Sequence, residues 1–246
     1  MQIVIVTGAA GGIGRVYAKA LAEAGYGVVA ADLGAGADDV AGEISAAGGA
    51  ALAVKVDVSD RRSAEAMAAQ VLQRFGRIDG LVNNAAYYTA IVKKDFTELT
   101  DAEWDRCFAV NVRGAWLCAR AVTAAMKRQR AGKIVNVSSM TVPTAPPGFA
   151  HYISSKAAII GLTRALAREL GEHGICVNTL TPDYIAFDRD YDNRQPEMRT
   201  MLTAQRCFRR EAGADDLIGT LLYLLGPGSD FVTGQDIWVN GGRAFG

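Results

Sequence analysis

Histidine and cysteine are scarce in this chain of 246 residues, which contains two histidines and four cysteines. The cysteines are Cys107, Cys118, Cys176 and Cys207, and no two of them form a CxxC pair. Zinc sites and disulfide frameworks need tighter groups of these residues. We therefore expect reduced thiols and no metal site.

An excess of charge is also absent, because 26 Lys and Arg residues balance 26 Asp and Glu residues. Nucleic-acid partners usually require a basic surface that neutralises phosphates, so no nucleic-acid partner is expected. The most apolar stretch, residues 217–225, is too short to cross a bilayer, so we expect no membrane association. The chain opens without a basic leader, which predicts no signal peptide and a cytoplasmic location.

Short β-branched runs alternate with longer helical patterns along the chain. The predicted strands are Ile3–Val6, Val28–Ala31, Ala51–Val56, Ile78–Val82, Lys133–Val137, Ile175–Leu180 and Asp236–Val239. The predicted helices are Gly14–Ala24, Ala37–Ala47, Arg62–Phe75, Ala102–Arg128, Tyr152–Leu170 and Ala214–Leu225. This alternation predicts an α/β fold, a doubly wound and mostly parallel seven-stranded sheet with helices on both faces. No linker or repeat divides the chain, so one domain over residues 1–246 is expected.

Residues 183–211 lack a convincing pattern and mix arginines with acidic residues. Loops of this length in compact domains are usually lids or disordered segments. The aromatic side chains of Tyr184 and Phe187, with Met198 and Met201, favour a lid that closes over an apolar ligand.

A glycine-rich segment, Thr7-Gly8-Ala9-Ala10-Gly11-Gly12-Ile13-Gly14, follows the first predicted strand and opens the first helix. Glycines permit a sharp turn and let a pyrophosphate approach the helix N-terminus, where free N–H groups favour negative charge. A purely structural turn is the alternative, but the strand–turn–helix context favours dinucleotide binding.

Asp32 ends the second predicted strand, 18 residues after Gly14. A carboxylate there can accept hydrogen bonds from both hydroxyls of an adenosine ribose and would repel a 2′-phosphate. No Lys or Arg occurs in residues 33–36, and Arg15 is as readily explained by a solvent-facing role. The alternative is a capping or turn aspartate; in this context Asp32 predicts NAD as the cofactor, in preference to NADP.

Tyr152 and Lys156 lie four positions apart on a predicted helix, and Ser139 lies upstream at the end of a predicted strand. Residues at this spacing share one helix face. A neighbouring ammonium stabilises a phenolate and so lowers the tyrosine pKa, which makes Tyr152 a candidate general base for an alcohol proton. Such a pair is common by chance on solvated helices, but its occurrence with Ser139 and the glycine-rich turn favours a catalytic site.

In combination, these residues resemble the short-chain dehydrogenases/reductases of the single-domain, NAD-binding type, over essentially the whole chain. The segments that carry the resemblance are residues 7–14, Asp32, 57–58, 83–86, Asn111, 136–139, Tyr152, Lys156, 177–178, Pro182 and 240–242. The resemblance implies a Rossmann-type fold and an NAD(H)-dependent alcohol dehydrogenase or carbonyl reductase. It also implies a homotetramer or homodimer, and the apolar helix segment 157–162 is consistent with a subunit interface.

The resemblance further implies a role for each site residue. Tyr152 would be the acid/base and Ser139 would orient the substrate oxygen. Lys156 would lower the phenol pKa and bind the nicotinamide ribose, while Asn111 would hold a water in a proton relay through Lys156. Contacts with the cofactor are implied for Gly8, Gly12, Ile13, Gly14, Asp32, Leu33, Asp57, Val58, Asn84, Ala85, Tyr152, Lys156, Pro182 and Ile185.

Three residues depart from the family pattern. Ala86 stands where Gly is usual and would tighten the approach of the cofactor. Asp183 replaces the Gly that usually follows Pro182, and aspartate is one of the few residues that tolerate positive φ. Phe187 replaces a Thr that usually binds the nicotinamide carboxamide, which predicts a rearranged start of the lid.

The residues expected around the reacting carbon are strongly apolar and aromatic. They are Tyr87, Tyr88, Met140, Phe149, Tyr184 and Phe187, together with the polar Ser139. This set predicts a secondary alcohol or ketone, or an aldehyde, with an aromatic or cyclic group. One alternative is an anionic hydroxy acid held by lid arginines, although nearby acidic residues could pair with most of them. The other is a non-catalytic NAD-binding or sensing protein, which has no need of the complete Ser–Tyr–Lys set.

Overall fold

A single seven-stranded sheet forms the centre of the computed structural model, which describes residues 1–185 and 196–246. Its strands are β1 (Ile3–Thr7), β2 (Gly27–Asp32), β3 (Ala51–Lys55), β4 (Gly80–Asn83), β5 (Gly132–Val137), β6 (Ile175–Pro182) and β7 (Asp236–Val239). Their order is β3-β2-β1-β4-β5-β6-β7, and every neighbouring pair is parallel. The predicted seven-stranded, doubly wound sheet is confirmed, and it is entirely parallel.

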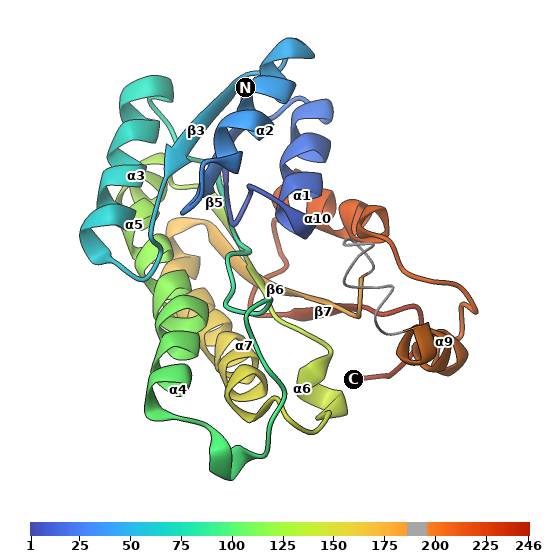
Figure 1. Ribbon diagram of the computed structural model, residues 1–246. Helices are drawn as coiled ribbons and strands as arrows, with labels where there is room; N and C mark the ends of the chain where they lie inside the picture. Colours follow the sequence, from blue (N-terminus) through green and yellow to red (C-terminus); the bar gives the residue numbers. More distant parts are fainter. Residues whose placement is uncertain (186–195) are drawn as a thin grey trace.

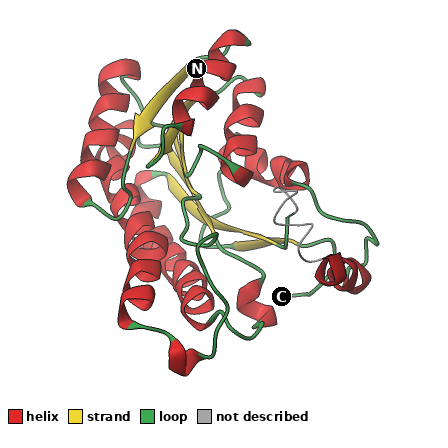
Figure 2. Ribbon diagram, in the orientation of Figure 1, coloured by secondary structure: helices red, strands yellow, loops and turns green. Residues whose placement is uncertain are grey.

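Helices cover both faces of the sheet (Figures 1 and 2). One face packs against α1 (Gly12–Glu23), α2 (Gly36–Ala46) and α10 (Ile218–Leu225). The other packs against α3 (Arg61–Phe75), α5 (Gly114–Gln129) and α7 (Ala150–Leu170). Within β1, Ile3 and Ile5 are buried on the α3/α5 side while Val4 and Val6 are buried on the α1/α2 side. Burial on both faces explains why the strands are continuous apolar runs.

The remaining elements are short and lie near the rim of the sheet. They are α4 (Asp101–Phe108), α6 (Thr141–Thr144) and α9 (Pro196–Gln205), with 3₁₀ turns at Phe96–Glu98, Gly171–His173, Ala214–Leu217 and Pro227–Ser229. Figure 1 shows the C-terminus between α6 and α9. In the described ranges, no helix combines the length and the apolar character needed to span a bilayer.

Two helical predictions differ from the structure. The expected helix Ala102–Arg128 is divided into α4 and α5 by a π-helical turn at Ala109–Arg113, a feature that often marks a functional site. The expected lid, residues 183–211, contains α9, which has only Met198, Met201 and Leu202 as its apolar side chains of any size. Hydrophobic periodicity does not reveal a π-helical turn within a helix, and it does not reveal a short helix with few apolar residues.

The order in which the chain adds strands to the sheet reverses at β1, because β2 and β3 lie on one side of it and β4 to β7 lie on the other. Ligands of open parallel sheets bind at the carboxyl ends of the strands near this point. Thr7, Asp32, Asn83, Val137 and Pro182 end their strands at this edge, so the fold brings the predicted motifs together.

Candidate active site

A cavity of about 660 Å³ lies at the carboxyl edge of the sheet. All the predicted cofactor residues line it: Gly8, Gly12, Ile13, Gly14, Asp32, Leu33, Asp57, Val58, Asn84, Ala85, Tyr152, Lys156, Pro182 and Ile185. The predicted substrate residues Ser139, Tyr87, Tyr88, Met140, Phe149 and Tyr184 line the same cavity. Phe187 lies outside the described residues, so its predicted place is not addressed by the structure.

The glycine-rich turn leaves room for a pyrophosphate. A Cβ atom on Gly11, the N-cap of α1, would meet no atom within 4 Å, whereas a Cβ atom on Gly14 would overlap the Gly8 carbonyl oxygen. Gly12 has a φ of 53°, which a side chain rarely adopts. The first turn of α1 carries no acidic residue, so its free N–H groups are available to an anion. These residues therefore fit the diphosphate of a dinucleotide.

Hydrogen bonds from Asn84 connect this turn to the end of β4. Its Nδ2 donates to the carbonyl oxygens of Thr7 at 3.0 Å and Gly8 at 3.2 Å. The Thr7 hydroxyl in turn accepts the N–H groups of Asn84 and Ala85, both at 3.1 Å. These bonds connect the turn to the residues that follow β4.

Asp32 orders the loops on either side of it. Its Oδ2 accepts the Ala10 N–H at 2.9 Å and its Oδ1 accepts the Gly34 N–H at 3.0 Å. The two basic residues of α1, Arg15 and Lys19, both pair with Glu43 of α2. Neither is therefore an unpaired cation for a 2′-phosphate at this end of the cavity.

Asp57 and Val58 follow β3 at the same end. The Asp57 carboxylate accepts the N–H of Ser59 at 2.9 Å and its hydroxyl at 2.6 Å. The hydrogen bond from the Ser59 hydroxyl lowers the pKa of Asp57 below its usual range. Val58 is buried and packs where a Cβ atom on Gly114 would come within 2.8 Å. The position suits the predicted adenine contact.

Tyr152 lies on the first turn of α7 with its ring enclosed by other aromatic side chains. The Tyr88 ring centroid is 5.1 Å from that of Tyr152, and the Phe149 centroid is 6.2 Å away. This burial raises the pKa of the Tyr152 phenol, while a hydrogen bond with Ser139 lowers it in part. The net direction is opposite to the one predicted from Lys156 alone, so the protein without ligands holds Tyr152 as a phenol.

Lys156 lies one helical turn further along α7. Its Nζ donates to the Val137 carbonyl oxygen at 2.8 Å and lies 5.8 Å from the Tyr152 ring centroid. Burial lowers the pKa of Lys156 to about 8. The Ser138 hydroxyl donates to the Lys156 carbonyl oxygen at 2.9 Å and fixes this part of the helix against β5.

The Ser139 hydroxyl is oriented by Thr141. Its oxygen accepts the Thr141 N–H at 3.2 Å and the Thr141 hydroxyl at 3.0 Å. An oxygen whose lone pairs are used in this way directs its own proton elsewhere. Ser139 therefore donates this proton in its hydrogen bond with Tyr152, at the wall of the cavity that both residues line.

Asn111 does not line the cavity with the other predicted catalytic residues; it is buried in the π-helical turn. Its Oδ1 accepts the Tyr87 N–H at 2.7 Å and its Nδ2 donates to the Ser155 hydroxyl at 2.9 Å. Asn111 thus connects the Tyr87 loop to α7. Its part in a water relay stays a prediction.

Asp183 does not use the positive φ considered for it. The described non-glycine residues with positive φ are Arg130 and Ala145. Instead, the Asp183 carboxylate is fully buried and pairs with Arg206 and Arg243. The substitution of the usual Gly therefore introduces a buried ion pair.

Sequence reasoning missed several residues that line the cavity. They are Thr89, Lys93, Arg106, Val110, Thr144, Pro146, Leu202 and Arg243. Most belong to loops or to segments far apart in sequence, and no local pattern marks them. Arg243 follows Asn240-Gly241-Gly242, and that motif is the nearest signal in the sequence.

The lid arginines are the predicted alternative ligands for a carboxylate on the substrate. In the described part of the lid, Arg199 pairs with Glu211, Arg206 with Asp183, and Arg210 with Asp216. These pairings were anticipated from the nearby acidic residues. They leave these three arginines poorly placed to bind a substrate acid.

Comparisons with known proteins agree with this geometry. The family model described as enoyl-(acyl carrier protein) reductase matches residues 8–244. The chain is 37% identical to 3-oxoacyl-[acyl-carrier-protein] reductase FabG of Staphylococcus aureus over 242 residues, which cover 97% of this chain and 96% of the relative. It is 36% identical over 244 residues to (2S)-[(R)-hydroxy(phenyl)methyl]succinyl-CoA dehydrogenase subunit BbsD of Thauera aromatica, with 99% and 96% covered.

The structure is also similar to a crystal structure of gluconate 5-dehydrogenase from Burkholderia cenocepacia in complex with NADP and tartrate. The TM-score is 0.91 at 29% identity, with 98% of this chain and 94% of the other covered. The names of these three proteins refer to an acyl chain, a phenyl-bearing carbinol and a sugar acid. Similarity therefore leaves the substrate to be inferred from the cavity.

Proposed function

Because the chain belongs to the short-chain dehydrogenase/reductase family, we propose that it interconverts a secondary alcohol and its ketone with NAD(H), on substrates that carry an aromatic or cyclic group. The proposal includes aldehydes as a second carbonyl class. The observation that carries it is the presence of Ser139, Tyr152 and Lys156 in the same cavity as the glycine-rich turn. A protein that only binds or senses NAD has no need of these three side chains together.

The bound nicotinamide would accept a hydride from the carbinol carbon or return it to the carbonyl carbon. Tyr152 would take the proton of the alcohol oxygen in oxidation and return a proton in reduction. Ser139 would donate its proton to the same oxygen and hold it against Tyr152. Lys156 would favour the phenolate through its positive charge, which the burial of Tyr152 makes necessary. Asn111 would act indirectly, by supporting a water relay that ends at Lys156.

The preference for NAD rests on Asp32 and Glu43. A 2′-phosphate would meet the Asp32 carboxylate, while Arg15 and Lys19 are both paired with Glu43. The gluconate 5-dehydrogenase structure contains NADP, so membership of the family does not decide the cofactor. We expect kcat/KM with NADH to exceed that with NADPH by a wide margin. Comparable values for the two cofactors would contradict this part of the proposal.

The aromatic or cyclic substrate class follows from the side chains around the reacting position. Phe149 and Tyr152 form one buried apolar cluster with Cys107, and Tyr87 and Tyr88 pack against it. Buried rings stack on flat ligands or pack against hydrocarbon. The name of the BbsD relative includes a phenyl-bearing carbinol, which is compatible with this inference.

The decisive test is NADH-dependent reduction of aryl ketones, aldehydes, sugar-derived ketones and aliphatic keto acids by wild-type protein and Tyr152→Phe. Aryl or cyclic ketones should have the highest kcat/KM. The Phe variant should lose turnover yet bind NADH almost normally, because it lacks only the proton carrier. A preference of tenfold or more for sugar-derived ketones or aliphatic keto acids would overturn the substrate class. More than a tenth of the wild-type rate in Tyr152→Phe would overturn the role of Tyr152.

A homotetramer, or a homodimer, forms part of the proposal. The outer face of α7 presents Ala157 and Gly161 to solvent beside the half-buried Ile160. Trp104 on α4 and Trp116 on α5 are 40% and 42% exposed, respectively. Apolar surface of this kind on neighbouring helices is typical of a subunit interface. Light scattering coupled to size exclusion should give a multiple of the chain mass, and a monomer at micromolar concentration would contradict it.

A further inference from the structure

The segment after β7 folds back onto the cavity. Asn240 holds this turn, since its Nδ2 donates to the Ala244 carbonyl oxygen at 2.8 Å and its Oδ1 accepts the Gly242 N–H at 2.8 Å. The same Nδ2 lies 3.6 Å from the sulfur of Met140, the residue after Ser139. The turn thereby places Arg243 at the wall of the cavity that Ser139 also lines.

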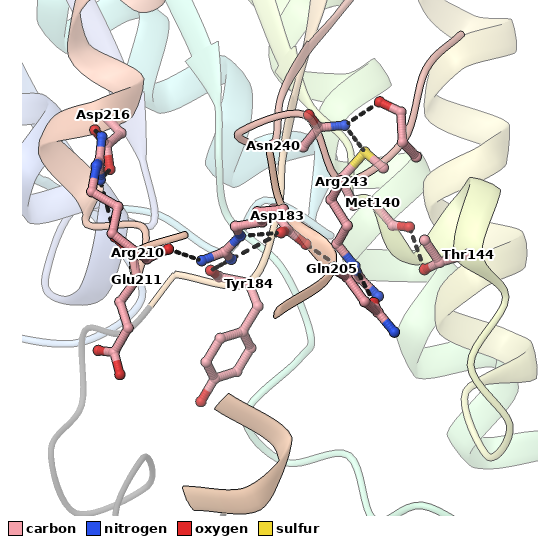
Figure 3. Close-up of polar contacts among 12 residues, drawn as sticks. Met140, Thr144, Asp183, Tyr184, Gln205, Arg210, Glu211, Asp216, Asn240 and Arg243 are labelled. Carbon is pink, nitrogen blue, oxygen red and sulfur yellow. Dashed lines mark hydrogen bonds and ion pairs between the residues drawn. The ribbon is translucent and has the colours of Figure 1, made fainter. Parts of the chain in front are cut away.

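Arg243 is held in a defined orientation by two residues from other elements. Its Nη1 donates to Oδ1 of Asp183 at 2.6 Å, and its Nε donates to Oε1 of Gln205 at 3.0 Å (Figure 3). Its side chain keeps 14% of its surface exposed, and it lines the cavity. No described residue accepts a hydrogen bond from its third nitrogen, Nη2. A guanidinium fixed at two nitrogens with the third exposed in a cavity is preorganised for an anion.

The charges around Asp183 do not balance. Nε and Nη2 of Arg206 lie 2.9 and 2.8 Å from Oδ2 of the same carboxylate that receives Arg243. Two guanidinium groups thus share one buried carboxylate. The remaining donors of Arg206 reach the carbonyl oxygens of Arg210 at 3.2 Å and Tyr184 at 2.9 Å, so Arg206 has no exposed donor to offer. The surplus positive charge is therefore accessible through Arg243.

The other acidic residues that line the cavity lie at the end away from Arg243. Apart from Asp183, the acidic lining residues are Asp32, which ends β2, and Asp57, which follows β3, on the far side of β1. Asp183 and Arg243 follow β6 and β7, at the opposite end of the sheet. The pyrophosphate position at the start of α1 belongs to β1, so it lies between the two ends. An anion at Arg243 would consequently be part of the substrate.

We propose that Arg243 binds an acidic group of the substrate, a carboxylate in the simplest case, so that the substrate combines a ring and an anionic group with the reacting carbinol. This inference rests on the proposed function and narrows its substrate class. A carboxylate bound at Nη2 would balance the second guanidinium of the Asp183 cluster. It would also fix the distance between the anionic group and the carbon that reacts at Ser139 and Tyr152.

The test uses aryl ketones in pairs that differ only in charge. Suitable pairs are 4-acetylbenzoate with 4-acetylbenzamide, 3-acetylbenzoate with its amide, and 3-benzoylpropionate with its amide, which place the acid at different distances. For at least one pair, wild-type kcat/KM should be at least tenfold higher for the acid. In Arg243→Gln the ratio of acid to amide should fall to within twofold of one. Arg243→Lys, which keeps the charge but not the planar fork, should give an intermediate ratio.

Arg210→Gln provides a matched control, because Arg210 pairs with Asp216 and does not line the cavity. It should retain the wild-type ratio. Calorimetric Kd values of each acid and amide for the enzyme–NADH complex give a readout without turnover, so a failure of the proposed reaction would be recognised separately. Equal kcat/KM and Kd for acids and amides in the wild type, or an unchanged ratio in Arg243→Gln, would overturn the proposal. The proposal would also be overturned if Arg243→Gln lost NADH affinity and its kcat/KM fell equally for the acid and the amide of each pair.

Discussion

Replacement of Lys156 by Met should change how stability depends on pH. Burial lowers the pKa of Lys156 from 10.5 to about 8 in the folded protein, while the unfolded chain keeps the higher value. Between these values the unfolded state binds more protons at this residue, so its contribution to the free energy of unfolding becomes more favourable as the pH rises. Below pH 8 the full cost of burying the ammonium is present. The cost is relieved as the pH approaches 10.5.

The size of the effect follows from the two pKa values. A difference of about 2.5 pKa units corresponds to about 3.4 kcal/mol, of which about 2.5 kcal/mol is gained between pH 7 and pH 10. The Met variant lacks this contribution, whereas the lost hydrogen bond to Val137 affects both pH values alike. The stability of Lys156→Met relative to wild type should therefore be about 2.5 kcal/mol more favourable at pH 7 than at pH 10.

Urea denaturation of both proteins without cofactor, at pH 7 and pH 10 and at one protein concentration, measures this difference directly. Titration of all other groups cancels to first order in the comparison. Lys127→Met, which removes an exposed lysine of α5, is the control and should show no such pH dependence. A change of less than about 0.5 kcal/mol between the two pH values would refute the reasoning, because it would mean that Lys156 is not buried as an ammonium.

Three further substitutions test other parts of the site. Asp32→Ala should narrow the preference for NADH over NADPH, chiefly through weaker NADH binding, as measured by kcat/KM for each cofactor. Gly14→Ala should raise the Kd for NADH at least tenfold, because its Cβ would come within 2.6 Å of the Asn84 amide nitrogen as well as overlap the turn; Gly42→Ala, whose Cβ has open space, should leave it unchanged. Asp183→Asn should cost about 3–5 kcal/mol in urea unfolding, since it leaves the buried guanidinium of Arg206 and the partly buried guanidinium of Arg243 without their carboxylate.

The fold and the cofactor half of the site could be predicted because their signals are contiguous in sequence. Each strand is a short apolar run flanked by polar or glycine residues, and all seven occur where they were predicted, within about two residues. The glycine-rich turn and Asp32 directly follow or end their strands, so a local pattern also fixes their place at the carboxyl edge. Asn84 illustrates the limit of this reasoning, because its hydrogen bonds to Thr7 and Gly8 join residues that are 77 and 76 positions apart in sequence.

The substrate half could be predicted only in its general character. Its apolar aromatic residues were recognised, but the helix α9, the π-helical turn and the place of Arg243 were not. Asp183 contacts Arg206 and Arg243, which are 23 and 60 residues away in sequence. Hydrophobic periodicity does not indicate which charged residues pair across such separations. The direction of the Tyr152 pKa also depends on burial, which the spacing to Lys156 does not reveal.

The departure at position 183 connects these two halves of the cavity. Where the family pattern has a glycine after Pro182, this chain has a carboxylate, and a buried carboxylate needs cationic partners. Arg206 supplies one from the segment after α9, and Arg243 supplies the other from the turn after β7. The carboxylate at position 183 thus contacts two distant segments at the wall of the cavity. Residues that follow the family pattern indicate the chemistry of the site. Asp183 departs from that pattern, and it indicates the end of the cavity where we propose that the charge of the substrate is recognised.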